Sequence, residues 1–160
     1  MRRKGMRGGV AARALVAALA IGLTVMGCAS GGRGTGGEGY VAPRPALDAF
    51  LAAAKARDLE AMGAVWGGER GSAAAYMPRE EREKRLLIMQ CHLQHDSARI
   101  LAEYPADGGR RGFRVELVFR GVTRATTMQA ALGPNRRWYL ESADIEKTAE
   151  FCRLGGVGKG

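Results

Sequence analysis

Residues 113–119, FRVELVF, decide the fold class of this chain. The apolar side chains of Phe113, Val115, Leu117 and Phe119 alternate with mostly charged neighbours. A period of two is typical of a strand with one buried face and one exposed face. Antiparallel sheets commonly have one such covered face, so the segment predicts a strand of an antiparallel sheet.

The same period appears on both sides of this segment. Three further strands are predicted, over residues 97–104, 122–132 and 137–145. Short turns rich in Gly, Asp and Pro separate them, at residues 106–109, 121 and 133–135. Sequential strands joined by short turns predict a four-stranded antiparallel sheet, followed by one short closing turn of helix at residues 146–154.

Helical patterns precede the sheet. From residue 46 onward, Leu47, Phe50 and Ala54 recur at the spacing of one helix face. Asp58 predicts a break and the N-cap of a second, short helix. Residues 67–77 predict a loop of small residues with no strong strand signal, and Pro78 suits the first turn of a third helix that runs to about residue 93.

Helices followed by strands predict an α+β fold, with three N-terminal helices packed on a curved four-stranded sheet. Residues 46–66, ALDAFLAAAKARDLEAMGAVW, resemble the first helices of the nuclear-transport-factor-2-like (SnoaL-like) superfamily. The resemblance covers most of residues 45–145 and implies a cone in which three helices close a curved sheet. That superfamily includes isomerases, cyclases, dehydratases and domains without enzymatic activity, so the resemblance leaves the function open.

The N-terminal segment predicts where the protein goes. Residues 1–13 are basic, and residues 14–26, ALVAALAIGLTVM, form an apolar stretch that is too short to span a bilayer but matches a signal peptide. The stretch ends in Val25-Met26-Gly27-Cys28, which resembles the lipobox of bacterial lipoproteins. The resemblance implies cleavage before Cys28 and acylation of that cysteine, and Ala29 after it favours the outer membrane over the inner membrane.

These patterns divide the chain into four parts. They are a lipoprotein signal peptide (residues 1–27), a lipidated cysteine with a Gly-rich tether (28–40), a single α+β domain (41–153) and a flexible tail (154–160). Gly-rich segments with few apolar residues bury too little surface to offset the entropy of ordering them.

Length and composition indicate a single domain and argue against nucleic-acid binding. The chain has 160 residues, enough for one ordinary domain. Its formal net charge is +9, but five of the 25 basic residues lie before residue 28, and without them the 20 remaining exceed the 16 acidic residues by only four. This balance, the 6% aromatic content and the absence of a recognised motif argue against nucleic-acid binding.

The cysteines have separate predicted roles. If Cys28 is lipidated, Cys91 and Cys152 remain, and an even number in an oxidising compartment indicates a disulfide. Two buried free thiols are the alternative. A catalytic cysteine is poorly supported, because the thiolate needs an activating partner and the adjacent His92 would not face Cys91 on a helix.

One cluster has residue types suited to chemistry, namely His92, His95 and Asp96. No metal site is predicted, because the chain has no third histidine and no HExxH spacing. The resemblance implies that Asp96 or His95 could transfer a proton inside the cone, whereas a helix-end contact and a turn also explain them. Strand residues could line that cone if they point inward: Tyr104, Arg114, Glu116, Arg124, Trp138 and Tyr139.

The sequence therefore predicts an envelope lipoprotein, anchored to the outer membrane and facing the periplasm, whose small domain binds a ligand or an envelope protein without catalysis. The alternative is a periplasmic enzyme of isomerase or hydratase type that uses Asp96 or His95. No cofactor is predicted. The two hypotheses differ in what they need, because the enzyme requires an accessible carboxylate or imidazole in a concave pocket.

Overall fold

The computed structural model describes residues 39–156, which belong to one compact unit. The predicted signal peptide, Cys28, the tether up to residue 38 and the last four residues of the predicted tail lie outside the described residues. Between residues 39 and 156, no helix combines the length and apolar character that crossing a membrane requires.

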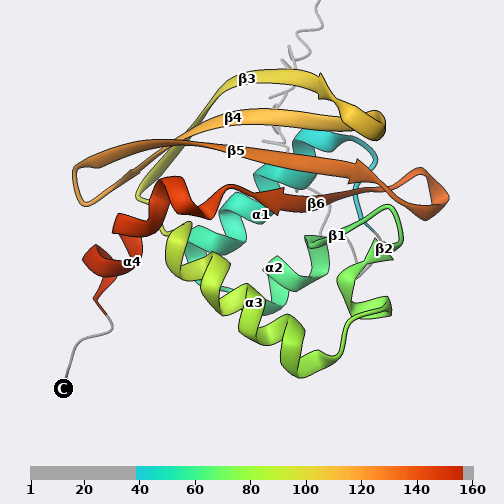
Figure 1. The fold of residues 1–160 in the computed structure, drawn as a ribbon, viewed down its shortest axis with the longest axis horizontal. Coiled ribbons are helices and arrows are strands. Elements are labelled where there is room, and N and C mark those ends of the chain that lie inside the picture. Colours follow the sequence, from blue (N-terminus) through green and yellow to red (C-terminus); the bar gives the residue numbers. More distant parts are fainter. Residues whose placement is uncertain (1–38, 157–160) are drawn as a thin grey trace, which may run out of the picture. The chain divides into compact units, whose positions relative to one another are not determined.

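The described chain is an α+β fold, as the sequence predicts (Figure 1). Its four α-helices are α1 (Pro43–Ala56), α2 (Leu59–Val65), α3 (Arg79–His92) and α4 (Ala149–Gly155). The main sheet has the antiparallel order β3-β4-β5-β6, formed by β3 (Ser97–Ala106), β4 (Arg110–Phe119), β5 (Val122–Leu132) and β6 (Trp138–Ala143). The predicted four-stranded antiparallel sheet is confirmed.

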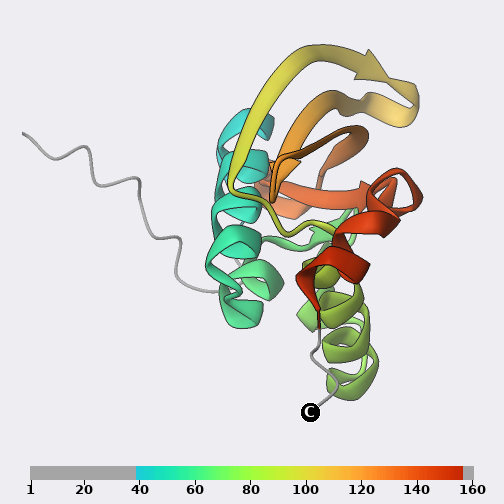
Figure 2. The ribbon, with the colours of Figure 1, turned by 90° about the vertical axis from the view of Figure 1, so that its left-hand side faces the viewer.

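The two faces of the sheet differ as the alternating pattern predicts. On β4, Phe113, Val115 and Leu117 are fully buried, and Phe113 lies opposite Met128 of β5. The other face exposes Arg114, and no helix covers it in Figure 2. The apolar face therefore forms the core together with the helices on that side.

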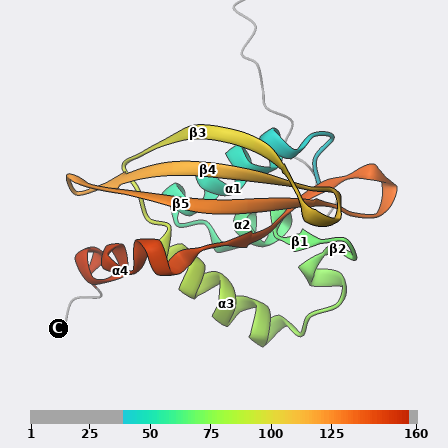
Figure 3. The same cartoon turned by 45° about the horizontal axis from the view of Figure 1, so that its top comes forward.

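The helices contribute unequally to this core. Helix α1 packs on β5 and β6, and α2 packs on α1. Helix α3 packs chiefly against α2 and α4, apart from the sheet, as Figure 3 shows. Within α3 only Leu86 and Met89 are buried, so much of this helix faces solvent.

The prediction of a loop without strands at residues 67–77 is wrong. This segment contains β1 (Gly67–Gly68) and β2 (Gly71–Ser72), which pair as a short antiparallel hairpin, and the 3-10 turn Ala73–Ala75. Strands of two residues carry no period, so the sequence pattern could not reveal them. Tertiary contacts position the hairpin, because Arg110 of β4 pairs with Glu69 in its turn at 3.0 Å and with Glu141 of β6.

Other boundaries differ by a few residues. Helix α1 begins at Pro43 rather than at residue 46, and Pro78 is the N-cap of α3 rather than part of its first turn. Strand β6 ends at residue 143, two residues earlier than predicted. The chain then forms the 3-10 turn Ile145–Thr148 and the seven-residue α4, which is longer than the predicted closing turn and continues past residue 153.

Asp58 caps α2 as the sequence predicts, because its Oδ1 accepts a hydrogen bond from the Ala61 N–H at 2.9 Å. Replacing it by alanine leaves this N–H without its partner. We expect Asp58→Ala to lower the free energy of unfolding by about 1 kcal/mol, as measured by urea denaturation of the full chain. Asp58→Asn should cost much less, since the amide oxygen can accept the same bond; equal losses in both variants would contradict the capping role.

Candidate functional site

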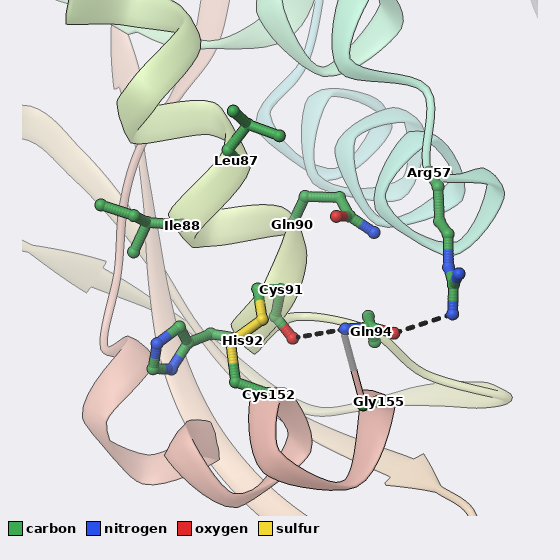
Figure 4. A pocket seen from close by; sticks show the side chains of 10 residues that line it. Arg57, Leu87, Ile88, Gln90, Cys91, His92, Gln94, Cys152 and Gly155 are labelled. Atoms are coloured by element: carbon green, nitrogen blue, oxygen red, sulfur yellow. Dashed lines mark hydrogen bonds between the residues drawn. A yellow bond between two sulfur atoms is a disulfide. The ribbon is translucent and has the colours of Figure 1, made fainter. Parts of the chain in front are cut away.

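An open groove of about 430 Å³ lies between the C-terminal half of α3 and α4 (Figure 4). Helix α3 lines it with Leu87, Ile88, Gln90, Cys91 and His92. The rest of the lining consists of Arg57, Gln94, Cys152, Gly155 and Gly156. We call this site the disulfide groove, because the bond between Cys91 and Cys152 lies in its lining.

Two aliphatic side chains of the groove face solvent. Leu87 is 51% exposed and Ile88 is 52% exposed. They belong to the apolar run at residues 86–89, in which Leu86 and Met89 turn inward to the core. A helix at 3.6 residues per turn cannot bury four consecutive side chains against one neighbour, so the middle two remain outside.

Two hydrogen bonds orient the side chain of Arg57, the arginine that lines the groove. Arg57 donates to the Gln94 side-chain oxygen at 2.9 Å, and the Gln94 amide donates to the Cys91 carbonyl at 3.0 Å (Figure 4). Gln94 is only 7% exposed, so its side chain is held in place and fixes the position of the Arg57 guanidinium. Among residues 39–156, no acidic side chain forms an ion pair with Arg57, and no acid lines the groove.

Arg57 also occupies a backbone conformation that favours glycine. It follows α1 in the left-handed region, with φ 58°, while the Asp58 N–H closes the helix on the Ala53 carbonyl at 3.0 Å. A side chain at this position costs about 1 kcal/mol relative to glycine. Arginine therefore stands at a position where glycine would be more stable.

The disulfide and its neighbours make this wall rigid. The Cα atoms of Cys91 and Cys152 are 4.9 Å apart, and the bond joins α3 to α4 across 61 residues of sequence. The His92 Nδ1 lies 2.9 Å from the Ile145 carbonyl oxygen and donates to it, which holds α3 against the 3-10 turn Ile145–Thr148 that precedes α4. A Cβ at Gly155 would come within 2.6 Å of the Gln94 side chain, so glycine permits the close approach of α4.

A second groove, of about 690 Å³, runs between α2 and α3. Charges of both signs line it, from Glu60, Glu83, Arg79 and Arg82. Arg79 and Glu83 already pair with each other at 2.6 Å. This groove therefore shows less preference for a ligand of one sign than the disulfide groove does.

His95 lines neither groove. It is 7% exposed, and its Nδ1 donates to the Leu93 carbonyl at 2.8 Å. Burial lowers the pKa of His95 below its ordinary value of 6.5, and the Lys55 ammonium acts in the same direction, against the Leu93 hydrogen bond and the Asp96 carboxylate. The imidazole is therefore held neutral in a packed environment.

This burial predicts a pH dependence of stability. In the unfolded chain His95 takes up a proton near pH 6.5, whereas in the folded chain it does so only at lower pH. The contribution of the neutral imidazole to the free energy of unfolding is complete above pH 6.5, the ordinary value. It is lost as the pH falls through the lowered pKa of the folded chain. We expect the free energy of unfolding to decrease between pH 7.5 and 5.5, with a slope from this group of at most about 1.4 kcal/mol per pH unit. His95→Gln should remove that part of the slope, and an unchanged slope would contradict the argument.

Asp96 has a structural role in the hairpin that joins β4 to β5. Its Oδ2 accepts a hydrogen bond from the Arg120 N–H at 2.7 Å, and its carbonyl accepts one from Lys55 at 2.7 Å. Arg120 and Gly121 form the tight turn with φ 48° and 79°. Asp96 therefore caps this turn, and it lines neither groove.

The strand residues considered as cone lining also lie outside both grooves. Tyr104 lies across Gly112, where a Cβ would come within 2.3 Å of its ring. The others have these positions: Arg114 is exposed, Glu116 pairs with Arg99 at 3.0 Å, Arg124 pairs with Glu150, Trp138 is half-buried and Tyr139 is buried. Within the described range, no cluster of three or more His, Cys, Asp or Glu side chains is arranged to hold a metal ion.

Sequence reasoning missed the main components of the disulfide groove. Leu87 and Ile88 were part of a predicted helix without being assigned to a surface. The signal was the unbroken apolar run at residues 86–89, which is wider than the face that one helix buries. Arg57 carried a weaker signal, a long charged residue just before the N-cap Asp58, where glycine is usual.

No protein-family model and no curated protein matches this sequence.

Proposed function

We propose that this protein is an envelope lipoprotein whose small domain binds a partner protein through the disulfide groove, without catalysing a reaction. One observation carries the proposal: the buried core is filled by the protein's own side chains, whereas the lining of the groove includes the exposed Leu87 and Ile88 and an arginine that pairs with no acid in the described chain. Exposed aliphatic side chains next to polar ones are typical of protein interaction sites.

The filled interior supports a surface function. Phe113, Val115, Leu117 and Met128 have no exposed area on the inner face of the sheet, and Phe50 of α1 packs in the same core. A small-molecule site inside the domain would need a cavity among these residues. We also propose that the domain has the cone-like fold that the superfamily resemblance implies, in which α1, α2 and α3 precede a curved sheet. The strand order and the bulge in β3 between Ile100 and Ala102 support this fold.

Helix α1 leads from the beginning of the described chain to the disulfide groove. Tyr40 pairs with Trp138, donating at 2.9 Å and accepting at 2.7 Å, so the described chain joins the domain at β6. From there α1 runs 14 residues, about 21 Å, to Arg57 in the groove.

Lipidation of Cys28 is tested by metabolic labelling with a fatty acid. We expect label on the wild-type chain and none on Cys28→Ser, because the thiol accepts the diacylglyceryl group. Separation of the two membranes should then show the labelled protein in the outer membrane, as Ala29 suggests. Equal labelling of both chains would contradict the anchor, and label in the inner membrane would contradict the localisation.

Partner binding is tested by photo-crosslinking from defined positions in intact cells. A photoreactive amino acid in place of Ile88 lies in the groove, and the same group in place of Ala125 lies exposed on the uncovered face of the sheet. We expect a discrete adduct from position 88, none from position 125, and loss of the first when Arg57→Gln is added. Equal adducts from both positions, or none from position 88, would contradict the proposal.

A further inference from the structure

The chemistry of the disulfide groove specifies its occupant more narrowly. We infer that the groove holds an acidic, aliphatic peptide segment of a partner protein, with a carboxylate on Arg57 and an aliphatic side chain on Leu87 and Ile88. The inference rests on the proposed function and adds the chemical class of the partner.

The charge of the groove selects an anion. Among the described residues that line the groove, Arg57 is the only one with a permanent charge, and none is acidic. Its guanidinium is oriented by Gln94, which is itself 7% exposed and held on the Cys91 carbonyl. An oriented guanidinium with donors left over binds carboxylates in two-pronged geometry.

The apolar part of the groove selects a side chain rather than a long acyl chain. Leu87 and Ile88 provide the exposed aliphatic surface, and Gln90 and His92 contribute polar groups to the same lining. An acyl chain needs a continuous apolar wall, whereas one or two aliphatic side chains of a peptide do not. The groove is partly open to solvent, which admits a segment of a larger partner.

Arg57 supplies an independent argument. The backbone of Arg57 lies in the left-handed region, where glycine fits without strain. Its hydrogen bond to Gln94 leaves the other N–H groups of the guanidinium for a ligand. By contrast, Arg79 in the second groove already pairs with Glu83. Arg82 of the second groove forms no ion pair in the described chain, but Glu60 and Glu83 line that groove with it, whereas no acid among residues 39–156 lines the disulfide groove.

The test uses a defined probe and the purified full chain. A fluorescein-labelled peptide, Gly-Glu-Ile-Leu-Glu-Gly with both ends blocked, is titrated and followed by fluorescence anisotropy. Two comparison peptides replace the Glu residues by Lys, or the Ile and Leu residues by Ser. We expect saturable binding of the first peptide, with each comparison peptide weaker by about tenfold or more.

Matched variants locate the binding. Arg57→Gln and Ile88→Gln should each weaken the acidic peptide by about tenfold. The controls are Arg114→Gln, an exposed arginine of the sheet, and Leu101→Gln, a leucine 40% exposed on β3; these should stay within about twofold of wild type. Equal losses in the controls, or equal binding of the Lys peptide, would overturn the inference.

The other occupants give distinct results. Displacement of the peptide by octanoate at a lower concentration than by unlabelled peptide would assign the groove to an amphiphile. Peptide-independent dimerisation that Ile88→Gln abolishes would assign it to a second copy, and tighter peptide binding after removal of residues 157–160 would show competition by the chain's own tail. The first two results overturn the inference, whereas the third supports the groove as a peptide site.

The peptide titration and the crosslinking experiment separate the inference from the proposed function. If no peptide binds but the crosslink from position 88 persists, the peptide chemistry is wrong and the proposed function stands. If both experiments fail, both are wrong.

Discussion

Phe113→Ala is expected to lower the free energy of unfolding by about 3–5 kcal/mol, the largest effect of any single substitution proposed for this chain. Phe113 has no exposed area and lies opposite Met128, in the middle of the apolar face of β4. Removing the ring loses its transfer free energy and leaves a cavity that the surrounding strands cannot close. Urea denaturation of the full chain measures the loss.

Two controls separate packing from other causes. Phe113→Leu keeps most of the volume and should cost clearly less than the alanine variant. Leu101→Ala removes an aliphatic side chain that is 40% exposed on β3 and should cost less than about 1 kcal/mol. A cost below about 1 kcal/mol for Phe113→Ala would mean that the residue lines a cavity, which would restore an interior ligand site.

Removing the disulfide is expected to cost about 2–4 kcal/mol. The bond between Cys91 and Cys152 closes a loop of 61 residues, and the loss of loop-closure entropy on cross-linking gives about 4 kcal/mol as an upper figure. The Cys91→Ser, Cys152→Ser double variant should unfold at a lower urea concentration and should not respond to added reductant. Wild type in reductant should approach the double variant.

Helix α4 should remain in place when the bond is absent. Phe151 is fully buried and its ring lies 5.7 Å from that of Phe119, so packing still holds the helix. Far-ultraviolet circular dichroism should therefore change little before unfolding. Two free thiols in denatured wild type after lipidation, without reductant, would show that the cysteines are unpaired in the cell.

The elements with strong local patterns were predictable. The alternation at residues 113–119 identified β4 and the buried face of the sheet, and Asp58 identified the break between α1 and α2. In each case the decisive interaction is short in sequence: side chains alternate by two along a strand, and a cap bonds three residues ahead. Such signals do not depend on the rest of the fold.

The candidate sites were not predictable in the same way. His95 and Asp96 were the conspicuous residues, yet His95 is buried on a carbonyl and Asp96 caps a turn. Leu87 was inconspicuous because a leucine in a helix is ordinarily a core residue. Whether such a side chain is buried depends on which element lies against its face.

The α+β class, the antiparallel sheet and the break at Asp58 follow from local patterns in the sequence, because periodicity and capping depend only on residues close together in the chain. Export and acylation of Cys28 are predictions from the pattern of residues 1–28. The tertiary structure alone decided that α3 packs on α2 and α4 rather than on the sheet, and that Arg57, Ile88 and Cys152 line one groove. Arg57 follows α1, Ile88 lies on α3 and Cys152 lies on α4, so they line one groove only after contacts form between segments far apart in the sequence.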